Sequence, residues 1–514
     1  MADNISDKII RNTLFNTVGT FWQIIITLVL TPYIISYIGI ERFGIWAIVG
    51  VLTGYFGLLD FGIGTGFVKY ISEYHTKNDY KKINQIINTG VTFYSILAIL
   101  IIIVGLFFIN PLLSIFSISE ELHSEAQFVF MLGIIIFCLS NALSAFGAIQ
   151  NGLQRMDITN KISIAVSIPM VIGTIYFLES GYGLRGLMIN NAIIFSISSI
   201  INIIIGLKLL PELRLSPFLF DKEMLKKLFS YGYKLQISRF AQLVSFQTDK
   251  LLITYFLGIG LVVFYQIGSS ITQLMRQIPL LVVSALIPAA SEIEARNGRE
   301  SLNELYLRGS KHLIFISTPL LFFVIINASL IVRTWMGEGY EMAVSIIQIL
   351  AIGYYANTVT GVASSIASGV ARTEFEMKFG SFMAILNLCL GIILIIKIGF
   401  IGVVIGTTIS LTISSLFFMK AFNKYLGCLL SDYIQLFYKP LFSCIIPTLI
   451  ILFLNYHFWP SIVLSDRLVN LSILGLKSII FGGIYIIIIL SWGYIDEKDK
   501  RLFRNKIPLL RYIL

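Results

Sequence analysis

The sequence predicts an all-α polytopic membrane protein with about 14 transmembrane helices, built as two parallel-repeat six-helix lobes and a C-terminal two-helix appendage. Three observations lead to this fold class. First, the chain is 56% hydrophobic and only 13% charged, whereas about 25% of the residues of a soluble domain are charged. Second, basic residues concentrate in alternate loops. Third, the two halves share glycines, charged residues and asparagines at matching positions.

The apolar stretches define the transmembrane segments in order. A helix needs about 20 mostly apolar residues to cross the hydrocarbon core of a bilayer. Segments that meet this length lie near 11–36, 43–68, 84–109, 124–150, 158–179, 184–210, 227–256, 260–290, 311–334, 342–371, 377–397, 399–424, 437–457 and 468–494. The connections between them are short and leave no room for an extramembrane catalytic domain, so we do not expect an enzyme.

The distribution of basic residues predicts the topology. Of the 38 Lys and Arg residues, 28 lie at the termini or in even-numbered loops. The odd-numbered loops hold only Arg42, Arg185, Arg333, Lys397 and Arg467. Because cytoplasmic loops carry an excess of Lys and Arg, both termini are predicted to be cytoplasmic. The net charge of +10 therefore follows from topology, and we expect no nucleic-acid partner.

An internal repeat divides the chain. When the sequence is aligned with itself at an offset of 216 to 219 residues, glycines, charged residues and asparagines of the first half fall opposite the same or similar residues of the second half. The matches include Gly39 with Gly258, Ser72 and Glu73 with Ser291 and Glu292, Gly90 with Gly309, Gly152 and Arg155 with Gly369 and Arg372, and Gly183 with Gly399. They predict lobes at 1–210 and 211–425, followed by 426–514, which holds the last two helices and a cytoplasmic basic tail. An even number of spans in each lobe gives the copies the same orientation, as in transporters whose halves rock in alternating access.

Polar residues inside segments 227–256 and 260–290 supply the main functional hypothesis. Each segment has one polar stripe at helical spacing. An ionised side chain at bilayer depth costs about 2.5 to more than 10 kcal/mol, so such groups normally face protein or a water-filled cavity. Polar contacts between helices would explain a single Gln or Ser, but the excess of bases favours a central cationic cavity for an anionic substrate. The candidate substrate-binding residues are Lys234, Arg239, Gln242, Lys250, Gln273, Arg276, Gln277 and Asn357.

Several smaller features have competing explanations. Asp60 and Asp249 are the clearly intramembrane acids, and they are candidates for ion coupling or for charge pairing. The small residues around Asn357 fit either tight helix packing or a cavity wall that binds sugar hydroxyls. The run Gly62-Ile-Gly64-Thr-Gly66 lacks the Lys-Ser/Thr of a phosphate loop, which favours close helix packing. The scattered cysteines and histidines suggest no disulfide, metal site or cofactor.

One set of motifs resembles a known family. The stretch Tyr37-Ile-Gly39-Ile-Glu41-Arg-Phe43-Gly44-Ile-Trp46, followed by Leu59-Asp60-Phe61-Gly62 and Ser72-Glu73, resembles the N-terminal signature of the polysaccharide-biosynthesis flippases. With the Gly-x-x-Gly entries at 183 and 399, the chain is similar to the Wzx-type O-antigen or capsule flippases of the MOP (MATE-like) superfamily. The resemblance implies translocation of an undecaprenyl-diphosphate-linked oligosaccharide across a bacterial cytoplasmic (inner) membrane, from the cytoplasmic to the periplasmic leaflet.

The same resemblance implies partners and leaves alternatives. The expected partners are the lipid-linked oligosaccharide, membrane lipids, a polysaccharide polymerase and a chain-length regulator, with H+ or Na+ as the candidate coupling ion. A MATE-like cation-coupled exporter is one alternative, although it would need more carboxylates facing its cationic drug. A lipid II-type flippase is another. A membrane glycan polymerase is less favoured because the odd-numbered loops are short and poor in bases.

Overall fold

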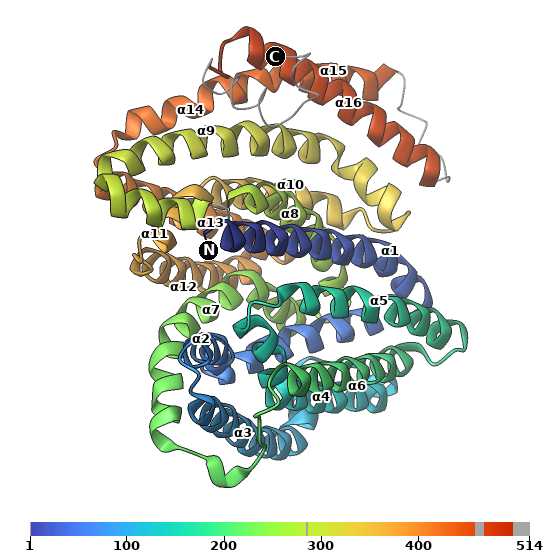
Figure 1. Ribbon diagram of the computed structural model, residues 1–514. Helices are drawn as coiled ribbons and strands as arrows, with labels where there is room; N and C mark the ends of the chain where they lie inside the picture. The colour runs from blue at the N-terminus through green and yellow to red at the C-terminus, as the bar shows by residue number, and fades with distance from the viewer. Residues whose placement is uncertain (1, 284–285, 458–466, 497–514) are drawn as a thin grey trace. The chain divides into compact units, whose positions relative to one another are not determined.

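The computed structural model describes residues 2–283, 286–457 and 467–496 (Figure 1). All regular elements in these ranges are helices, namely α1 to α16 and two short 3-10 turns, η1 and η2. The chain forms two compact units. The first comprises Met1–Val263 with Ile395–Phe400, and the second comprises Phe264–Leu394 with Ile401–Leu514. The predicted all-α fold class is thereby confirmed, while the predicted lobe boundary at residue 210 stays a prediction.

The first predicted span and most of the second follow one another in α1, with a kink between them. Helix α1 runs over Ala2–Phe56, but Gly39 inside it has φ 79° and ψ 175°, which is not helical. Gly39 lacks a Cβ and so tolerates this backbone conformation. After α1 come η1 (Gly57–Asp60) and α2 (Ile63–Thr76), which together complete the second predicted span.

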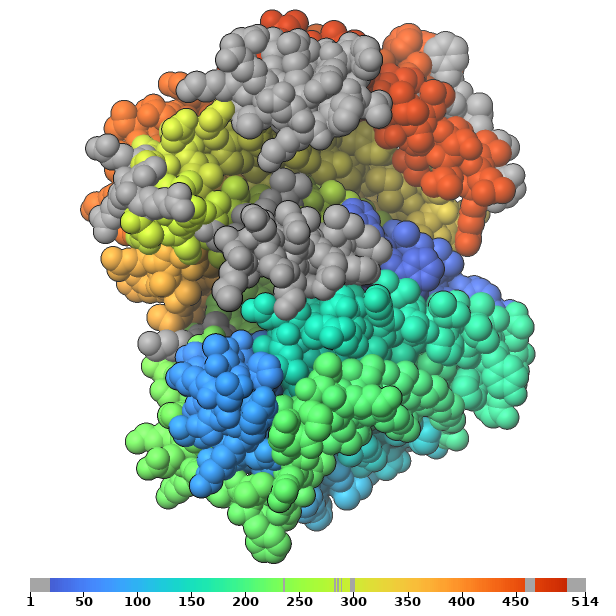
Figure 2. Space-filling view, in the orientation of Figure 1, coloured from blue at the N-terminus to red at the C-terminus, as the bar shows by residue number. Residues whose placement is uncertain are grey.

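The rest of the first unit consists of five long helices: α3 (Tyr80–Ile115), α4 (Glu120–Gly152), α5 (Met156–Glu179), α6 (Gly183–Leu209) and α7 (Lys222–Leu257). Helix α4 packs on α3 and α6, and α5 packs beside α6, so that α5 and α6 lie side by side on one face of this unit (Figure 2). Its core gathers Phe67, Tyr94, Phe146 and Leu228 from α2, α3, α4 and α7. Helix α7 is therefore an integral part of this unit.

The segment between α6 and α7, which contains η2 (Pro217–Leu219), is bound along α3 by side-chain amides. Asn84 Nδ2 donates to the carbonyl oxygen of Glu212 at 2.9 Å, and Asn84 Oδ1 accepts from the Arg214 N–H at 2.5 Å. One helical turn later, Asn88 repeats this pattern with the Arg214 carbonyl oxygen and the Ser216 N–H, both at 2.7 Å. Each amide thus pairs with a peptide backbone as a neighbouring β-strand would.

This row of polar side chains on α3, here called the amide ladder, continues to Asp221, the residue just before α7. Thr89 Oγ1 accepts from the Asp221 N–H at 2.9 Å, and Gln85 Nε2 donates to Asp221 Oδ2 at 3.2 Å. Asp221 is the N-cap of α7, where its other carboxylate oxygen accepts from the N–H groups of Glu223 and Met224. An N-cap carboxylate satisfies free N–H groups and favours the helix dipole. Helix α3 therefore sets where α7 begins.

The second unit contains the remaining helices. They are α8 (Leu261–Val283), α9 (Leu286–Met336), α10 (Met342–Thr358), α11 (Gly361–Gly369), α12 (Glu374–Ile398), α13 (Phe400–Leu426), α14 (Leu430–Ser443), α15 (Ile445–His457) and α16 (Arg467–Ser491). Helix α9 packs against α10, α11, α14 and α16. The core includes Tyr306 of α9, Phe422 of α13 and Tyr433 of α14. The predicted appendage is thus packed into this unit, although its basic tail lies outside the described residues.

The number of membrane-spanning helices agrees roughly with the prediction. Within the described ranges, 11 helices are long and apolar enough to cross a membrane. They count the two predicted spans of α1 once, and α7 and α8 are not among them. Large apolar side chains such as Phe107 and Ile172 are exposed on the helix surfaces, as lipid contact requires. The chain is a multi-pass membrane protein, and its orientation stays a prediction.

Candidate functional site

A break in the second predicted span forms the centre of the polar site in the first unit. Helix α1 ends at Phe56, and after η1 the residues Phe61 and Gly62 both have positive φ, 50° and 77°. A helix cannot continue through two such residues, so carbonyl groups of the preceding turn lose their helical partners. Gln236 of α7 supplies one replacement: its Nε2 donates to the carbonyl oxygens of Gly57 and Leu58 at 3.1 and 2.7 Å.

Helix α7 approaches the break closely. A Cβ built on Gly62 would lie 2.4 Å from the Cα of Gly232, so neither backbone could come so near if both residues carried side chains. Gly66 is similarly tight against Leu228. The close-packing interpretation of the glycine run is therefore confirmed. Gly232, Gln236 and Arg239 are spaced i, i+4 and i+7 and share one face of α7.

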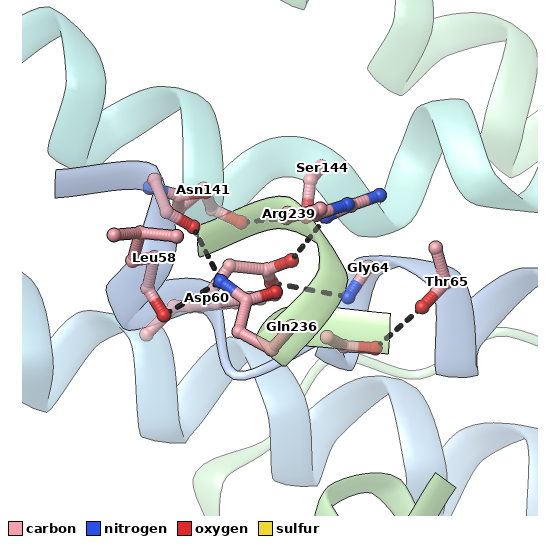
Figure 3. A network of polar contacts seen from close by, with 11 residues as sticks. Leu58, Asp60, Gly64, Thr65, Asn141, Ser144, Gln236 and Arg239 are labelled. Atoms are coloured by element: carbon pink, nitrogen blue, oxygen red, sulfur yellow. Dashed lines mark hydrogen bonds and ion pairs between the residues drawn. The ribbon is translucent and has the colours of Figure 1, made fainter. Parts of the chain in front are cut away.

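Asp60 is the acid at this break, and its two carboxylate oxygens have different partners (Figure 3). Oδ1 accepts from the Gly64 N–H at 3.1 Å and from the hydroxyl of Tyr94. Oδ2 lies 3.4 Å from Arg239 Nη1. The carboxylate side chain is 11% exposed, whereas the Arg239 side chain is 48% exposed. The pair thus joins a nearly buried acid to an arginine whose side chain remains accessible.

The wall beside this pair is polar. Ser144 of α4 donates to the carbonyl oxygen of Asn141 at 2.7 Å, and Figure 3 shows both residues beside Arg239. Gln236 and Arg239 point from α7 toward the turn that carries Leu58 and Asp60 (Figure 3). Sequences 141–144 and 236–239 are far apart in the chain and meet only in the fold.

The C-terminal part of α7 holds the other predicted residues of the first unit. Lys250 and Asp249 are both buried, and Lys250 Nζ donates to Gln247 Oε1 at 2.8 Å. The hydroxyl of Thr248, the residue after Gln247, shares a hydrogen bond of 2.5 Å with the hydroxyl of Tyr55 on α1. This part of the polar stripe therefore lies inside packed protein. Gln242 is exposed, and the side chain of Lys234 lies outside the described part of the structure.

In the second unit, Arg276 contacts the junction between two consecutive helices. Its Nε donates to Asn357 Oδ1 at 2.7 Å. Asn357 lies next to the end of α10, and the chain resumes as α11 at Gly361. Arg276, Gln273, Gln277 and Asn357 are all half-buried. The structure thus brings two predicted binding residues, Arg276 and Asn357, into direct contact.

The predicted site residues therefore form separate groups. Asp60 joins Arg239, Lys250 lies on a buried stretch of the same helix, and Arg276 joins Asn357 in the other unit. Gln236, Tyr94 and Gly232 are not among the residues predicted from the sequence. The i, i+4, i+7 spacing of Gly232, Gln236 and Arg239 was a signal that could have identified two of them. Among the described residues, no group of His, Cys, Asp or Glu side chains could hold a metal ion.

Comparison with known proteins identifies the family. The sequence profile of the polysaccharide biosynthesis protein family matches residues 9–294. The chain belongs to this family. A putative O-antigen transporter of Shigella flexneri is 22% identical over 428 residues, which cover 81% of this chain and 98% of that protein. The alignment therefore extends beyond the segment matched by the family profile.

Solved structures share the fold. The lipid II flippase MurJ in an inward closed conformation superposes with a TM-score of 0.72 at 19% identity, covering 93% of this chain and 98% of that one. An inward-facing MATE family multidrug resistance transporter of the MOP superfamily gives 0.68 at 15% identity, with 80% and 94% covered. The profile match confirms the expected polysaccharide-biosynthesis family, and the solved structures show that the fold is shared with a transporter of the MOP superfamily. These findings support a membrane transporter.

Proposed function

We propose that this protein moves a polyprenyl-diphosphate-linked oligosaccharide from the cytoplasmic to the periplasmic leaflet of a bacterial inner membrane. Family membership and the full-length similarity to a putative O-antigen transporter support the substrate class. The observation that carries the proposal is the contact between Arg276 and Asn357, a half-buried guanidinium oriented by a neutral amide inside an apolar chain. Alternating access of the two predicted six-helix halves is part of this proposal.

The chemistry of the substrate explains the need for arginine. A diphosphate and several sugars cannot cross hydrocarbon unaided, so the protein must replace their hydration with fixed donors and positive charge. At an effective dielectric constant near 20, one pair of opposite charges about 5 Å apart contributes about 3 kcal/mol. The planar guanidinium can also bind two phosphate oxygens at once, which a lysine cannot do.

The bond to Asn357 orients Arg276 without itself neutralising the charge, because an amide is uncharged. Asn357 adjoins the junction between α10 and α11, where its carbonyl oxygen accepts from the N–H and the hydroxyl of Thr360. In this proposal Gln273 and Gln277 supply further donors and acceptors for the glycan. Arg239, Gln242 and Lys234 belong to the proposed set on α7. Lys250 is buried in this structure and would join them only when alternating access exposes that part of the stripe. In this proposal Asp249 and Asp60 supply charge pairing or coupling to H+ or Na+.

The fold is shared with drug exporters, so a cation-coupled exporter is the alternative function. Such a protein would present a carboxylate to a cationic drug. Asp60 instead places one oxygen against Arg239 and the other against the Tyr94 hydroxyl and the Gly64 N–H. This arrangement favours the anionic substrate.

Arg276 provides the decisive experiment. With protein abundance matched, we expect Arg276→Ala to abolish export of the surface glycan and Arg276→Lys to retain part of it, because the charge survives without the planar fork. Arg372→Ala is the matched control, since Arg372 is exposed and pairs with Glu374 at 3.1 Å. Normal abundance with normal export in Arg276→Ala would discard the binding role. Reconstituted protein tested with a labelled lipid-linked oligosaccharide and with a cationic drug then separates flippase from exporter.

A further inference from the structure

We propose that Asp60 is an internal competitor for Arg239, occupying the arginine until the phosphate of an anionic substrate displaces it. This inference rests on the proposed function, because it takes Arg239 as a group that binds the diphosphate. It assigns Asp60 a specific role: its carboxylate sets how strongly an anion must bind before the arginine is released to it.

The two oxygens of Asp60 make such an exchange feasible. Removing the partner of a buried charge is normally very unfavourable, because the remaining charge is left without compensation. Here the Gly64 N–H and the Tyr94 hydroxyl both donate to Oδ1, and only Oδ2 contacts Arg239. When Arg239 departs, the carboxylate keeps two donors, and hydrogen bonds to a carboxylate stabilise its charged form.

The geometry of Arg239 also favours exchange. Its contact with Asp60 is a single Nη1 to Oδ2 approach of 3.4 Å, not the parallel two-bond arrangement of a strong arginine–carboxylate pair. Its side chain is 48% exposed although its partner is 11% exposed. An incoming phosphate can therefore reach the guanidinium and offer a bidentate contact in place of the single one.

Competition of this kind gives selectivity. A neutral or cationic ligand cannot replace the carboxylate at the guanidinium, so only an anion gains this interaction. In the substrate-free protein the pair also compensates one positive charge of the α7 stripe. Gln236 is not part of the exchange, because it binds the carbonyl oxygens of Gly57 and Leu58 and holds α7 in place.

The test measures binding of farnesyl diphosphate, a short polyprenyl diphosphate, to the full-length protein in nanodiscs at one pH. We expect Asp60→Asn to bind this probe about tenfold more tightly than wild type, which corresponds to about 1.4 kcal/mol. Arg239→Gln should cost more affinity in the Asp60→Asn background than in wild type, because only there is the arginine fully available. Farnesol, which has no phosphate, should bind all variants equally. Equal or weaker diphosphate binding by Asp60→Asn would overturn the inference.

Two further variants guard against misfolding of Asp60→Asn. Asp60→Ser also removes the charge and is expected to tighten binding in the same way. Tyr94→Phe acts in the opposite direction: it removes a donor from Asp60, strengthens the hold of the carboxylate on Arg239 and should weaken probe binding severalfold. Unchanged or tighter binding by Tyr94→Phe contradicts the inference. If no variant prefers farnesyl diphosphate to farnesol, the proposed function itself fails; if wild type and Asp60→Asn bind the diphosphate equally, only the competition fails.

Discussion

Gly62 and Gly232 let the break in the second span and helix α7 touch backbone to backbone. A Cβ on Gly232 would lie 2.3 Å from the carbonyl oxygen of Phe61, and one on Gly62 would lie 2.4 Å from the Cα of Gly232. A real Cβ essentially never comes within 3.0 Å of a non-bonded heavy atom. The position of Gln236 and Arg239 over the break thus depends on two missing side chains.

Gly232→Ala is expected to destabilise the protein although Ala is the better helix former. Replacing a glycine inside a helix by alanine normally stabilises it by about 0.5–1 kcal/mol. Here forced displacement of α7 should reverse the sign and cost about 1–3 kcal/mol. Gly147→Ala is the matched control, because a Cβ there meets nothing within 4 Å. Melting temperatures in detergent should fall for Gly232→Ala and hold or rise for Gly147→Ala; the same change in both would contradict the contact.

Gln236→Leu tests the support of the broken helix. The substitution removes the donor that serves the carbonyl oxygens of Gly57 and Leu58. Leaving buried acceptors unsatisfied costs about 1–3 kcal/mol. Gln242→Leu, on an exposed position of the same helix, should change stability by less than about 0.5 kcal/mol. Thermal unfolding of both variants in the same detergent measures the difference, and equal melting temperatures would remove Gln236 from this role.

The ladder on α3 predicts strong protection of the segment between α6 and α7. In the variant carrying Asn84→Ala and Asn88→Ala, hydrogen exchange at Arg214 and Ser216 should accelerate, because their N–H groups lose the acceptors Asn84 Oδ1 and Asn88 Oδ1. Lys81→Ala changes an exposed residue of the same helix and should leave this exchange unaltered. Mass-spectrometric exchange that is equally slow in both proteins would show that the amides do not hold the segment.

Tyr433 links the C-terminal helices to the junction between α10 and α11. Its buried hydroxyl donates to the carbonyl oxygen of Val359 at 3.1 Å. Tyr433→Phe should lower stability by about 1 kcal/mol through loss of this bond. Tyr438→Phe on the same helix α14 is the control, because that side chain is exposed. A lower melting temperature for Tyr433→Phe than for Tyr438→Phe is expected, and equal melting temperatures would show that this bond does not hold α14 to the junction.

Cysteine labelling tests the predicted topology. In a background without the 4 native cysteines, Lys77→Cys should react with an impermeant thiol reagent only from the cytoplasmic side, and Glu120→Cys only from outside. Both residues are exposed: Lys77 lies shortly before the first residue of α3, and Glu120 lies shortly after its last residue. Labelling with the reverse sidedness would overturn the positive-inside assignment.

The sequence predicted the helices well because span length and apolar content are properties of consecutive residues. It did not predict the break at Phe61 and Gly62, because a positive φ at phenylalanine depends on tertiary contacts. The predicted connection at residues 36–43 coincides with Gly39, whose non-helical backbone separates two helical stretches of α1. Local patterns thus placed the spans but not their interruptions.

The sequence predicted which residues belong to the candidate site but only in part which residues contact one another. Arg239 and Asp60 were both selected, the acid as a candidate for coupling or charge pairing, yet no pattern in the sequence joins residues 179 positions apart. Arg276 and Asn357 were selected for different reasons and their contact emerges only in the fold. Gln236 was missed because a single glutamine in an apolar helix is usually a general polar contact. Its function depends on carbonyl groups whose exposure the sequence does not reveal.

The amide ladder along α3 has a practical consequence for engineering. The segment that joins α6 to α7 would ordinarily be chosen for inserting a reporter or for expressing the chain as two pieces, because polar connections between helices tolerate such changes. Here Asn84 and Asn88 pair with its backbone, and Asp221 at its end starts α7. An insertion would separate these partners and shift α7 over the break. The turn containing Gly337 and Gly339, both with positive φ, is the better insertion point.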